Sequence, residues 1–227
     1  QRQMCIRDRF YNIMLGKVSS NLGFAPDFGQ KVVQKKISSY ELDEKNNSLI
    51  RYSNNWFDLS SIAKGYAVQK IHDYLTSNNL NNHLIDIGGE LIISGTKKGE
   101  PWNIGIQNPL ATIESSTITI NNKNHDFLSI ATSGEYRNYK FDDKGNKVTH
   151  TINPKTLSSI ANNILSVTIV NEISATYADA YATAFNAMGV KKALDVANSN
   201  NIASMIIFKN EDKVDIIYSD KWYDLFL

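Results

Sequence analysis

The sequence contains a single cysteine, Cys5, among 227 residues, so no internal disulfide can form. It also lacks any run approaching the ~18 consecutive apolar residues that a membrane-spanning helix requires. Lysine and arginine total 24 and aspartate and glutamate total 23, which gives a formal net charge of +1. A near-neutral chain without a basic block has no electrostatic basis for binding nucleic acid or an anionic membrane. Any bound phosphate therefore has to be held locally, by a metal ion or by backbone amides.

Proline is scarce as well, with four in the whole chain, and no Gly/Ser linker or internal repeat divides it. A single compact unit is the simplest organisation that fits this pattern. Residues 1–9 (QRQMCIRDR) are polar, lack periodicity and lead into no turn or cap. We interpret them as a non-native leader, and we expect one domain over residues 10–227.

The remaining pattern alternates short strands with helices. Amphipathic spacing predicts helices over residues 60–77, with Ser60 or Ser61 near the cap, and over residues 174–188, with Gly189 as the C-cap. A third helix is predicted at 193–199, and strands are predicted at 48–53, 83–87, 90–94, 102–107, 117–120, 127–132, 164–170, 203–208 and 214–218. We expect strands 117–120 and 127–132 to pair across a polar turn, and the last two strands to form a hairpin. Many short strands without regular βαβ alternation predict an α+β fold.

A carboxylate and two hydroxyl groups precede the first long helix, in the segment Asp58-Leu-Ser-Ser-Ile-Ala-Lys64. The amides at a helix N-terminus attract anions, and a lysine in the first turn strengthens that preference. Helix capping by Asp58 and Ser60, with Lys64 in solvent, is the commoner use of such residues. Spacing alone leaves both interpretations open.

Two adjacent glycines follow an apolar strand in the segment Leu84-Ile-Asp-Ile-Gly-Gly-Glu90. They permit a positive φ or a close approach of the backbone to another group. A plain β-bulge explains them equally well. No third glycine follows and no helix opens there, so the segment is not a dinucleotide-binding fingerprint.

One histidine, His150, lies in polar, turn-rich sequence. Its segment, residues 149–154 (THTINP), follows a stretch of small hydroxyl residues, a glycine and an arginine at residues 131–137 (ATSGEYR). A histidine beside a phosphate can act as a general acid or base, since its pKa lies near neutrality. A hydrogen bond that closes the loop is the simpler alternative.

The helix at residues 174–188 carries Asp179 and Thr183 four residues apart, and therefore on one face. The rest of the helix is rich in alanine, which lets a ligand or a second backbone approach closely. A carboxylate and a hydroxyl oxygen are ligands suited to magnesium. An exposed Asp and Thr on a tightly packed helix is the alternative.

Taken together and in this order, these segments resemble the ApbE family of FAD:protein FMN transferases over roughly residues 10–222. The matching stretches are GKVSSNLGFAP (16–26), DLSSIAKGYAV (58–68), LIDIGGELIISG (84–95), PWNIGIQNP (101–109), IATSGEYRNY (130–139), THTINP (149–154), LSVTIV (165–170) and ADAYATAFNAMG (178–189). The resemblance implies an α+β fold of mixed, largely antiparallel sheets packed with a few helices, similar to the T-fold. It also implies that the domain lacks the family's N-terminal portion.

The same resemblance implies a function. Members of this family use magnesium to split FAD, attach its FMN half through a phosphoester to a threonine or serine of a target flavoprotein, and release AMP. By position, Asp179 and Thr183 match the side-chain metal ligands, and Ser61 contributes to the same ion. Nucleotide contacts correspond to Asn12, Asp58, Lys64 and the backbone near Ile152, and His150 matches a histidine implicated in the chemistry.

Three positions depart from the family's usual pattern. Asn153 and Asn12 each stand where an aspartate is common, so hydrogen bonding is kept and charge is lost. Ala182 stands where some members carry a second acidic metal ligand, so only a backbone group or water can serve there. A weaker magnesium site than that of some relatives is expected.

Two other functions remain open from the sequence. The chain is a FAD pyrophosphatase if water replaces the target hydroxyl, or a flavin-binding protein without turnover if no cleavage occurs. Retention of Asp179, Thr183, Lys64 and His150 argues against the second. Family members are commonly exported and membrane-associated, as periplasmic or cell-surface lipoproteins, and others are cytoplasmic. We expect export and a membrane anchor in the full-length protein, which the gene sequence upstream of residue 1 would test.

Overall fold

The computed structural model describes residues 12–26, 40–52, 55–110, 116–134, 139–143, 145–160 and 162–226. The chain divides into two compact units, which are described separately below. The first comprises residues 1–59 and 139–161, and the second comprises residues 60–138 and 162–227. Residues 1–9, interpreted above as a leader, lie outside the described ranges, and the boundary of the domain at residue 10 stays a prediction.

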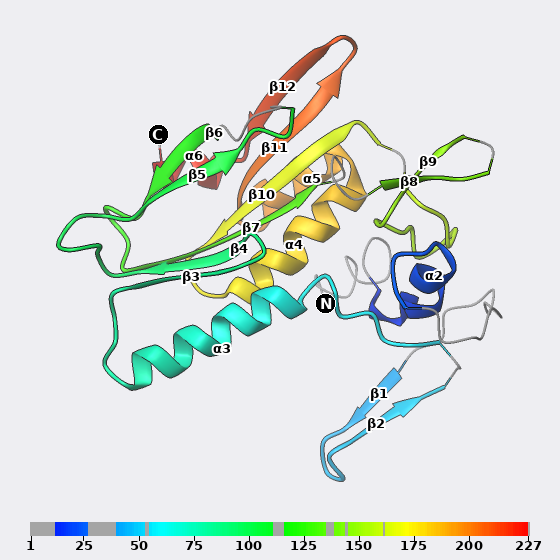
Figure 1. Ribbon diagram of the computed structural model, residues 1–227, viewed down its shortest axis with the longest axis horizontal. Coiled ribbons are helices and arrows are strands. Elements are labelled where there is room, and N and C mark those ends of the chain that lie inside the picture. Colours follow the sequence, from blue (N-terminus) through cyan, green and yellow to red (C-terminus); the bar gives the residue numbers. More distant parts are fainter. Residues whose placement is uncertain are drawn as a thin grey trace. The chain divides into compact units, whose positions relative to one another are not determined.

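The second unit is built on a six-stranded sheet in the order β12-β11-β10-β7-β4-β3 (Figure 1). Every neighbouring pair in it is antiparallel. Its strands are β3 (His83–Ile87), β4 (Glu90–Ser94), β7 (Phe127–Gly134), β10 (Ile164–Asn171), β11 (Ala203–Asn210) and β12 (Lys213–Tyr218). Both faces of the central strands are buried, which explains why β10 and β11 read as nearly continuous apolar runs.

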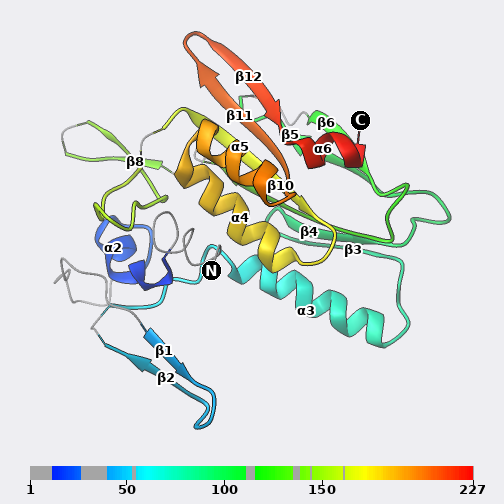
Figure 2. The ribbon, with the colours of Figure 1, turned by 180° about the vertical axis from the view of Figure 1, so that it is seen from behind.

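Three helices cover one face of this sheet (Figure 2): α3 (Ala63–Ser77), α4 (Ala175–Met188) and α5 (Val190–Ser199). The central helix α4 packs on β7 and β10 and is flanked by α3 and α5. Its buried residues Ala178, Ala182 and Phe185 meet Val167 and Ile169 of β10 in one hydrophobic cluster. Small alanines on α4 allow this close packing.

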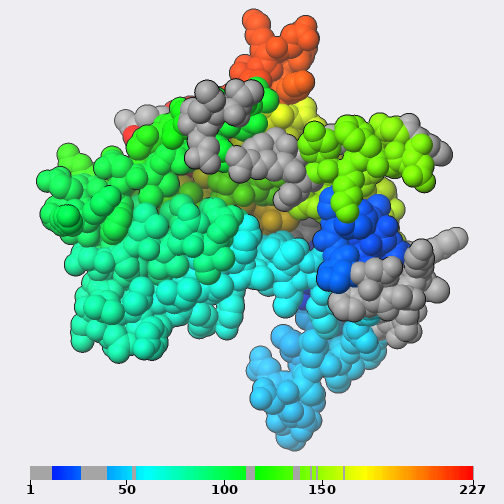
Figure 3. Space-filling model, viewed as in Figure 1, coloured from blue at the N-terminus to red at the C-terminus, as the bar shows by residue number. Residues whose placement is uncertain are grey.

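The opposite face of the sheet is covered by a two-stranded sheet, β5 (Asn103–Gln107) with β6 (Ser116–Asn121), and by the short helix α6 (Asp220–Phe226). Trp222 of α6 is fully buried there against apolar residues of the sheet. The tip of the β11–β12 hairpin projects from this unit (Figure 3). Among the residues that the structure describes, no helix is long and apolar enough to cross a membrane.

Most predicted elements of this unit are observed near their expected positions, and the α+β class with largely antiparallel sheets is confirmed. Gly189 ends α4 with a φ of 78°, as predicted. The predicted pairing of strands 117–120 and 127–132 is wrong, because β6 pairs with β5 while β7 lies between β4 and β10. The N-cap of α3 is Ile62, which makes no side-chain capping hydrogen bond, and Ser60 and Ser61 lie directly before it.

The first unit contains the short helices η1 (Ile13–Leu15) and α2 (Gly16–Asn21) and two hairpins. The hairpins are β1 (Tyr40–Asp43) with β2 (Ser48–Arg51), and β8 (Tyr139–Phe141) with β9 (Lys147–Thr149). All four residues of β2 are exposed, and Figure 3 shows the β1–β2 hairpin projecting from its unit. A small cluster of Leu15, Val18 and Ile152 joins η1 and α2 to the segment after β9.

Candidate active site

The first turns of α3 and α4 meet backbone to backbone at Gly65. A Cβ atom added to Gly65 would lie 2.4 Å from the carbonyl oxygen of Ala175 and 2.7 Å from the Cβ of Asp179. Real side chains do not tolerate such distances, so only glycine allows the two helices to approach this closely. Ala175 is itself buried against Val68 of α3. Lys64 and Asp179, two of the predicted site residues, flank this crossing.

The carboxylate of Asp179 is held at the start of α3. Its Oδ2 accepts a hydrogen bond of 2.8 Å from the backbone amide of Gly65, the third residue after the N-cap Ile62. That amide has no acceptor within its own helix, so Asp179 caps α3 from a neighbouring helix. The side chain is buried, and burial raises the pKa of the Asp179 carboxyl, while the Gly65 hydrogen bond and Lys64 act in the opposite direction.

The Lys64 ammonium lies at the turn between β3 and β4. It forms an ion pair with Oε2 of Glu90 and donates a hydrogen bond of 3.4 Å to the carbonyl oxygen of Gly88. Glu90 is almost completely buried at the first position of β4, whereas the Lys64 side chain is 42% exposed. The ion pair therefore joins a fixed, buried anion to a cation that solvent and ligands can reach.

Glu90 and Asp179 together place two carboxylates near one lysine. Burial raises the pKa of Glu90 to about 7; the Lys64 ammonium lowers it, and the charge of Asp179 raises it further. When both carboxylates are ionised, the three side chains carry a net charge of −1. Such a cluster favours an additional cation, because a buried negative charge is costly unless it is paired.

The remaining predicted metal ligands of this unit lie on α4 or directly before α3. Thr183 is partly buried one turn after Asp179, Ala182 is 1% exposed and offers only a methyl group, and Ser61 lies in the turn that opens α3. Among the residues that the structure describes, no three His, Cys, Asp or Glu side chains gather as a metal cluster. The side chains of Asp179, Thr183 and Ser61 offer only oxygen atoms, and Asp179 also supplies negative charge. These donor types fit a magnesium ion whose remaining coordination positions would be filled by water or phosphate oxygens.

The first unit gathers the other predicted residues around η1 and α2. Asn12 caps η1, since its Oδ1 accepts a 2.9 Å hydrogen bond from the Met14 amide. The Asp58 amide donates to the carbonyl of Ile13 at 2.6 Å, and Ile152 packs in the cluster beneath α2. The nucleotide contacts predicted at Asn12, Asp58 and Ile152 thus belong to one local structure, and their role in binding stays a prediction.

His150 lies in the same unit, directly after β9. Its ring stands edge-on to Phe24, with 6.2 Å between the ring centroids. Thr149, the preceding residue, is buried, and its backbone amide donates a 2.7 Å hydrogen bond to Ser159 Oγ. This anchoring holds the backbone at His150 and Ile152 against the small core of the unit.

Gly65 and Glu90 contact Asp179 and Lys64, respectively, but neither of them was assigned a role from the sequence. Glu90 is an acidic residue at the head of an otherwise apolar strand, ELIIS, and that contrast is the signal that could have identified it. Gly65 lies in the first turn of a helix, where glycine is unfavourable without a packing reason.

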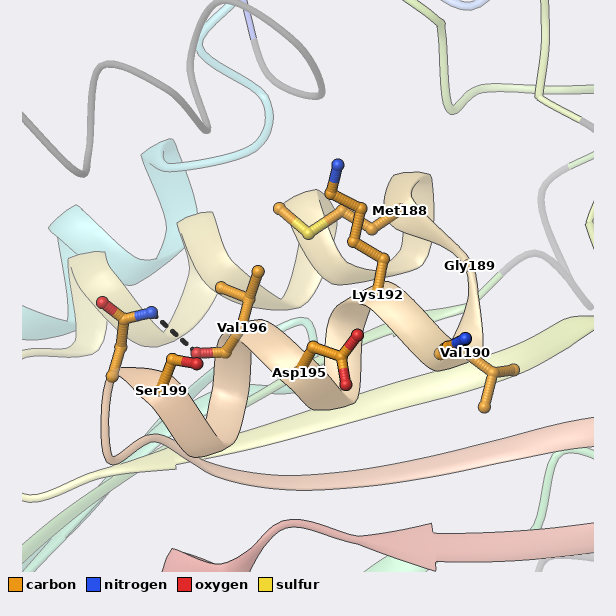
Figure 4. Close-up of a pocket in the computed structure, with 9 residues that line it drawn as sticks. Met188, Gly189, Val190, Lys192, Asp195, Val196 and Ser199 are labelled. Atoms are coloured by element: carbon orange, nitrogen blue, oxygen red, sulfur yellow. Dashed lines mark hydrogen bonds between the residues drawn. The ribbon is translucent and has the colours of Figure 1, made fainter.

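A pocket of about 620 Å³ lies along one side of α5, at its junction with α4 (Figure 4). Met188, Gly189, Lys192, Asp195 and Ser199 are among its lining residues. None of the predicted site residues lines this pocket. It is open to solvent, and we assign it no part in the chemistry.

Comparison with known proteins shows which family the chain resembles. The model of the ApbE family matches residues 5–207. A FAD:protein FMN transferase of Vibrio cholerae is 34% identical over 212 residues, which cover 88% of this chain and 62% of that protein. Another, of Haemophilus influenzae, is 36% identical over 158 residues, covering 69% of this chain and 44% of that protein. The chain thus spans less than two thirds of the length of these two relatives.

Solved structures show the same similarity. The flavin transferase ApbE from Vibrio cholerae superposes with a TM-score of 0.82 at 28% identity, covering 100% of this chain and 74% of that one. The apo form of the Pseudomonas stutzeri flavinyl transferase ApbE gives a TM-score of 0.81 at 26% identity, covering 99% and 72%. With a family match over most of its length and this fold, the chain belongs to the ApbE family.

Proposed function

We propose that this protein transfers FMN from FAD to a threonine or serine hydroxyl of a target flavoprotein, releases AMP and depends on magnesium. The observation that carries the proposal is the buried Asp179 carboxylate at the α3–α4 crossing, close to the Lys64–Glu90 ion pair. The names of the curated relatives, FAD:protein FMN transferase, support the reaction class.

The proposed roles follow from the donor types. Asp179, Thr183 and Ser61 hold the magnesium ion through oxygen atoms, and the backbone at Ala182 or a water molecule takes the place of a further acidic ligand. When bound, magnesium neutralises charge on the pyrophosphate and orients it. Asn12, Asp58, Lys64 and the backbone near Ile152 bind the nucleotide.

The transfer breaks one bond and forms another. The acceptor hydroxyl oxygen attacks the phosphorus of the FMN half, and the bond from that phosphorus to the bridging oxygen breaks. AMP leaves with the bridging oxygen, and His150 takes the hydroxyl proton. Negative charge grows on the bridging and non-bridging oxygens during this step, and the Lys64 ammonium stabilises it electrostatically.

The test is incubation of the protein with FAD, magnesium and a peptide that carries a candidate acceptor threonine, followed by mass spectrometry of the peptide and quantification of AMP. FMN-labelled peptide with one AMP released per label is expected. Free FMN and AMP without labelling would instead establish a pyrophosphatase. Tight FAD binding without magnesium-stimulated cleavage would establish a passive flavin-binding protein.

The two assignments within the mechanism are separable. Asp179→Ala is expected to abolish transfer by removing a metal ligand, and His150→Ala to slow it by about 10²–10⁴-fold, the usual contribution of a general base. Full transfer by His150→Ala alongside an inactive Asp179→Ala would overturn the base assignment and leave the metal assignment standing.

A further inference from the structure

Glu90 occupies a position that the turn between β3 and β4 determines. Ile87 pairs with Glu90, so Gly88 and Gly89 form a two-residue hairpin loop, and their φ values are 61° and 97°. Positive φ at both positions is what a type I′ turn requires, and glycine meets it without strain. The Gly89 amide also donates a 2.9 Å hydrogen bond to Oδ1 of Asp86. The turn conformation therefore determines where β4 begins and, with it, the position of Glu90.

The exposures of the two partners show which one is anchored. The Glu90 side chain is 5% exposed, against 42% for that of Lys64. Within the described part of the chain, the Lys64 ammonium contacts two acceptors, Glu90 Oε2 and the Gly88 carbonyl oxygen. An ammonium has three N–H donors. The third N–H remains available to a ligand on the exposed side.

We propose that Glu90 is a positioning residue, whose buried carboxylate holds the Lys64 ammonium in place so that its remaining N–H contacts the pyrophosphate of FAD. This inference rests on the proposed function, in which Lys64 binds the nucleotide. Without Glu90, the long lysine side chain samples many rotamers, and its ordering has to be completed during binding. Burial raises the pKa of Glu90 to about 7, which agrees with a carboxylate that is held inside the protein rather than in solvent.

The alternative is that Glu90 only stabilises the β3–β4 hairpin. The two roles differ in one respect: a positioning residue acts through Lys64, whereas a structural residue acts whether or not Lys64 is present. A double-mutant cycle of Glu90 and Lys64 separates them, because only residues that act on each other give non-additive effects.

The cycle uses Glu90→Gln, Lys64→Gln and the double variant in the 227-residue chain. The dissociation constant for FAD is measured by flavin fluorescence with magnesium at pH 8, where the Glu90 carboxylate is ionised. We expect Glu90→Gln to weaken FAD binding about 5- to 10-fold, because the Lys64 side chain is then no longer ordered before FAD binds. KM should rise in proportion to the dissociation constant, and the double variant should bind no more weakly than Lys64→Gln. Multiplicative losses, or an unchanged constant in Glu90→Gln, would overturn the inference.

A second measurement needs no flavin. Acetic anhydride labels the Lys64 amine, and peptide mass spectrometry gives the rate. The rate should rise severalfold in Glu90→Gln, because the amine is no longer held by the carboxylate; an unchanged rate would contradict the ion pair. Glu90→Asp, which keeps the charge but retracts it by one methylene, gives the same readouts if Glu90→Gln does not fold.

The matched control is Glu172→Gln. Glu172 pairs with Lys221 at 2.9 Å, in the same unit and outside the site, so this variant also loses a glutamate–lysine pair. Its FAD affinity and Lys64 labelling rate should equal those of the wild type. Wild-type chain that binds FAD without transferring FMN would overturn the proposed function alone, since the binding cycle still tests Glu90. Wild-type chain that does not bind FAD would overturn both.

Discussion

The Asp179 carboxylate serves the fold and the proposed chemistry with different charge requirements. Its hydrogen bond with the Gly65 amide needs an acceptor oxygen, which a neutral amide also supplies. Magnesium binding needs the negative charge. At the scale of single residues, the two roles are therefore separable by replacing the carboxylate with an amide of the same shape.

The first prediction concerns Asp179→Asn. Without magnesium, the variant should be at least as stable as the wild type, because burial raises the pKa of Asp179 and so disfavours the ionised form. FMN transfer should fall by at least about 100-fold, as expected when a metal ligand is lost. Urea denaturation and the peptide-labelling assay measure the two effects. An active variant that no longer responds to magnesium would refute the metal assignment.

At the scale of elements, the contact between α3 and α4 depends on the absence of one side chain. The crossing brings together a buried carboxylate from one helix and the amides at the start of the other. Gln69 of α3 contributes a second link, since its Oε1 accepts a 2.9 Å hydrogen bond from the Ala175 amide. The site geometry is therefore a property of the helix pair as much as of the residues on it.

The second prediction is that Gly65→Ala destabilises the protein by about 1–2 kcal/mol. The added methyl group would meet backbone of α4 that cannot rotate away, and this overpacking cost exceeds the ~1 kcal/mol that alanine gains in a helix. Urea denaturation measures the change. Lys70→Ala, at an exposed position of the same helix, is the control and should stay within about 0.5 kcal/mol. A more stable Gly65→Ala would show that the helices separate easily.

The other end of α3 is joined to β3 by a pair of histidines. His83 Nδ1 lies 2.7 Å from the Leu80 carbonyl, which only accepts, so this nitrogen carries the hydrogen. His83 Nε2 then accepts from His72 Nδ1 at 2.9 Å. The His72 ring also lies against Phe127 of β7, with 4.8 Å between centroids. Burial lowers the pKa of His72 below its ordinary 6.5; the neighbouring His83 lowers it further, and Asp73 opposes both.

The third prediction follows from the sign of that shift. The unfolded chain takes up the proton at a higher pH than the folded one, so the His72 contribution to stability is present above pH 6.5 and is lost as the pH falls below it. The midpoint of urea unfolding should therefore fall less between pH 7.5 and pH 5 in His72→Gln than in the wild type.

Glu90 changes stability in the opposite direction, which makes the comparison with a variant necessary. The pKa of Glu90 is about 7 in the folded protein, above the ordinary glutamate value of 4.5 that applies to the unfolded chain. Between these two pH values the unfolded chain loses the proton first, so the contribution of Glu90 to stability falls as the pH rises. The difference between wild type and His72→Gln removes this background. His125→Gln, a histidine paired with Glu172 elsewhere in the unit, is the control. Equal pH dependence in His72→Gln and wild type would contradict the prediction.

At the scale of the whole molecule, ligand binding is expected to appear as stability. A ligand at 100 times its dissociation constant stabilises the folded state by about 2.7 kcal/mol. For a protein of this size, that corresponds to a rise of roughly 5–10 °C in the unfolding midpoint.

The fourth prediction is that FAD and magnesium together raise the midpoint by more than the sum of their separate effects, because the phosphate oxygens complete the metal's coordination. Differential scanning fluorimetry with each ligand alone and with both measures this. Asp179→Asn should retain any shift caused by FAD alone and lose the magnesium-dependent part. Identical shifts with and without magnesium would count against the metal site.

The local pattern of residues determined much of this architecture in advance. Helix α4 and its glycine C-cap, the strands β3, β4 and β10, and the closing hairpin all lie close to their predicted positions. These features depend on periodicity and on the backbone preferences of single residues, which act between neighbours in the chain. The ordered motifs also identified the family, which the comparisons confirmed.

Only the tertiary structure decided which elements touch. Strand β7 follows a strand and a turn, which is the local pattern of a hairpin. Its partners are nevertheless β4 and β10, because most of its residues are buried and therefore belong at the centre of a sheet. Residues 64 and 90 are far apart in sequence, and their ion pair exists because α3 packs beside the β3–β4 turn. Burial and charge coupling arise from such long-range packing. The ordered motifs and the family resemblance singled out Asp179 and Lys64 as candidates, and the fold alone added Glu90 and Gly65.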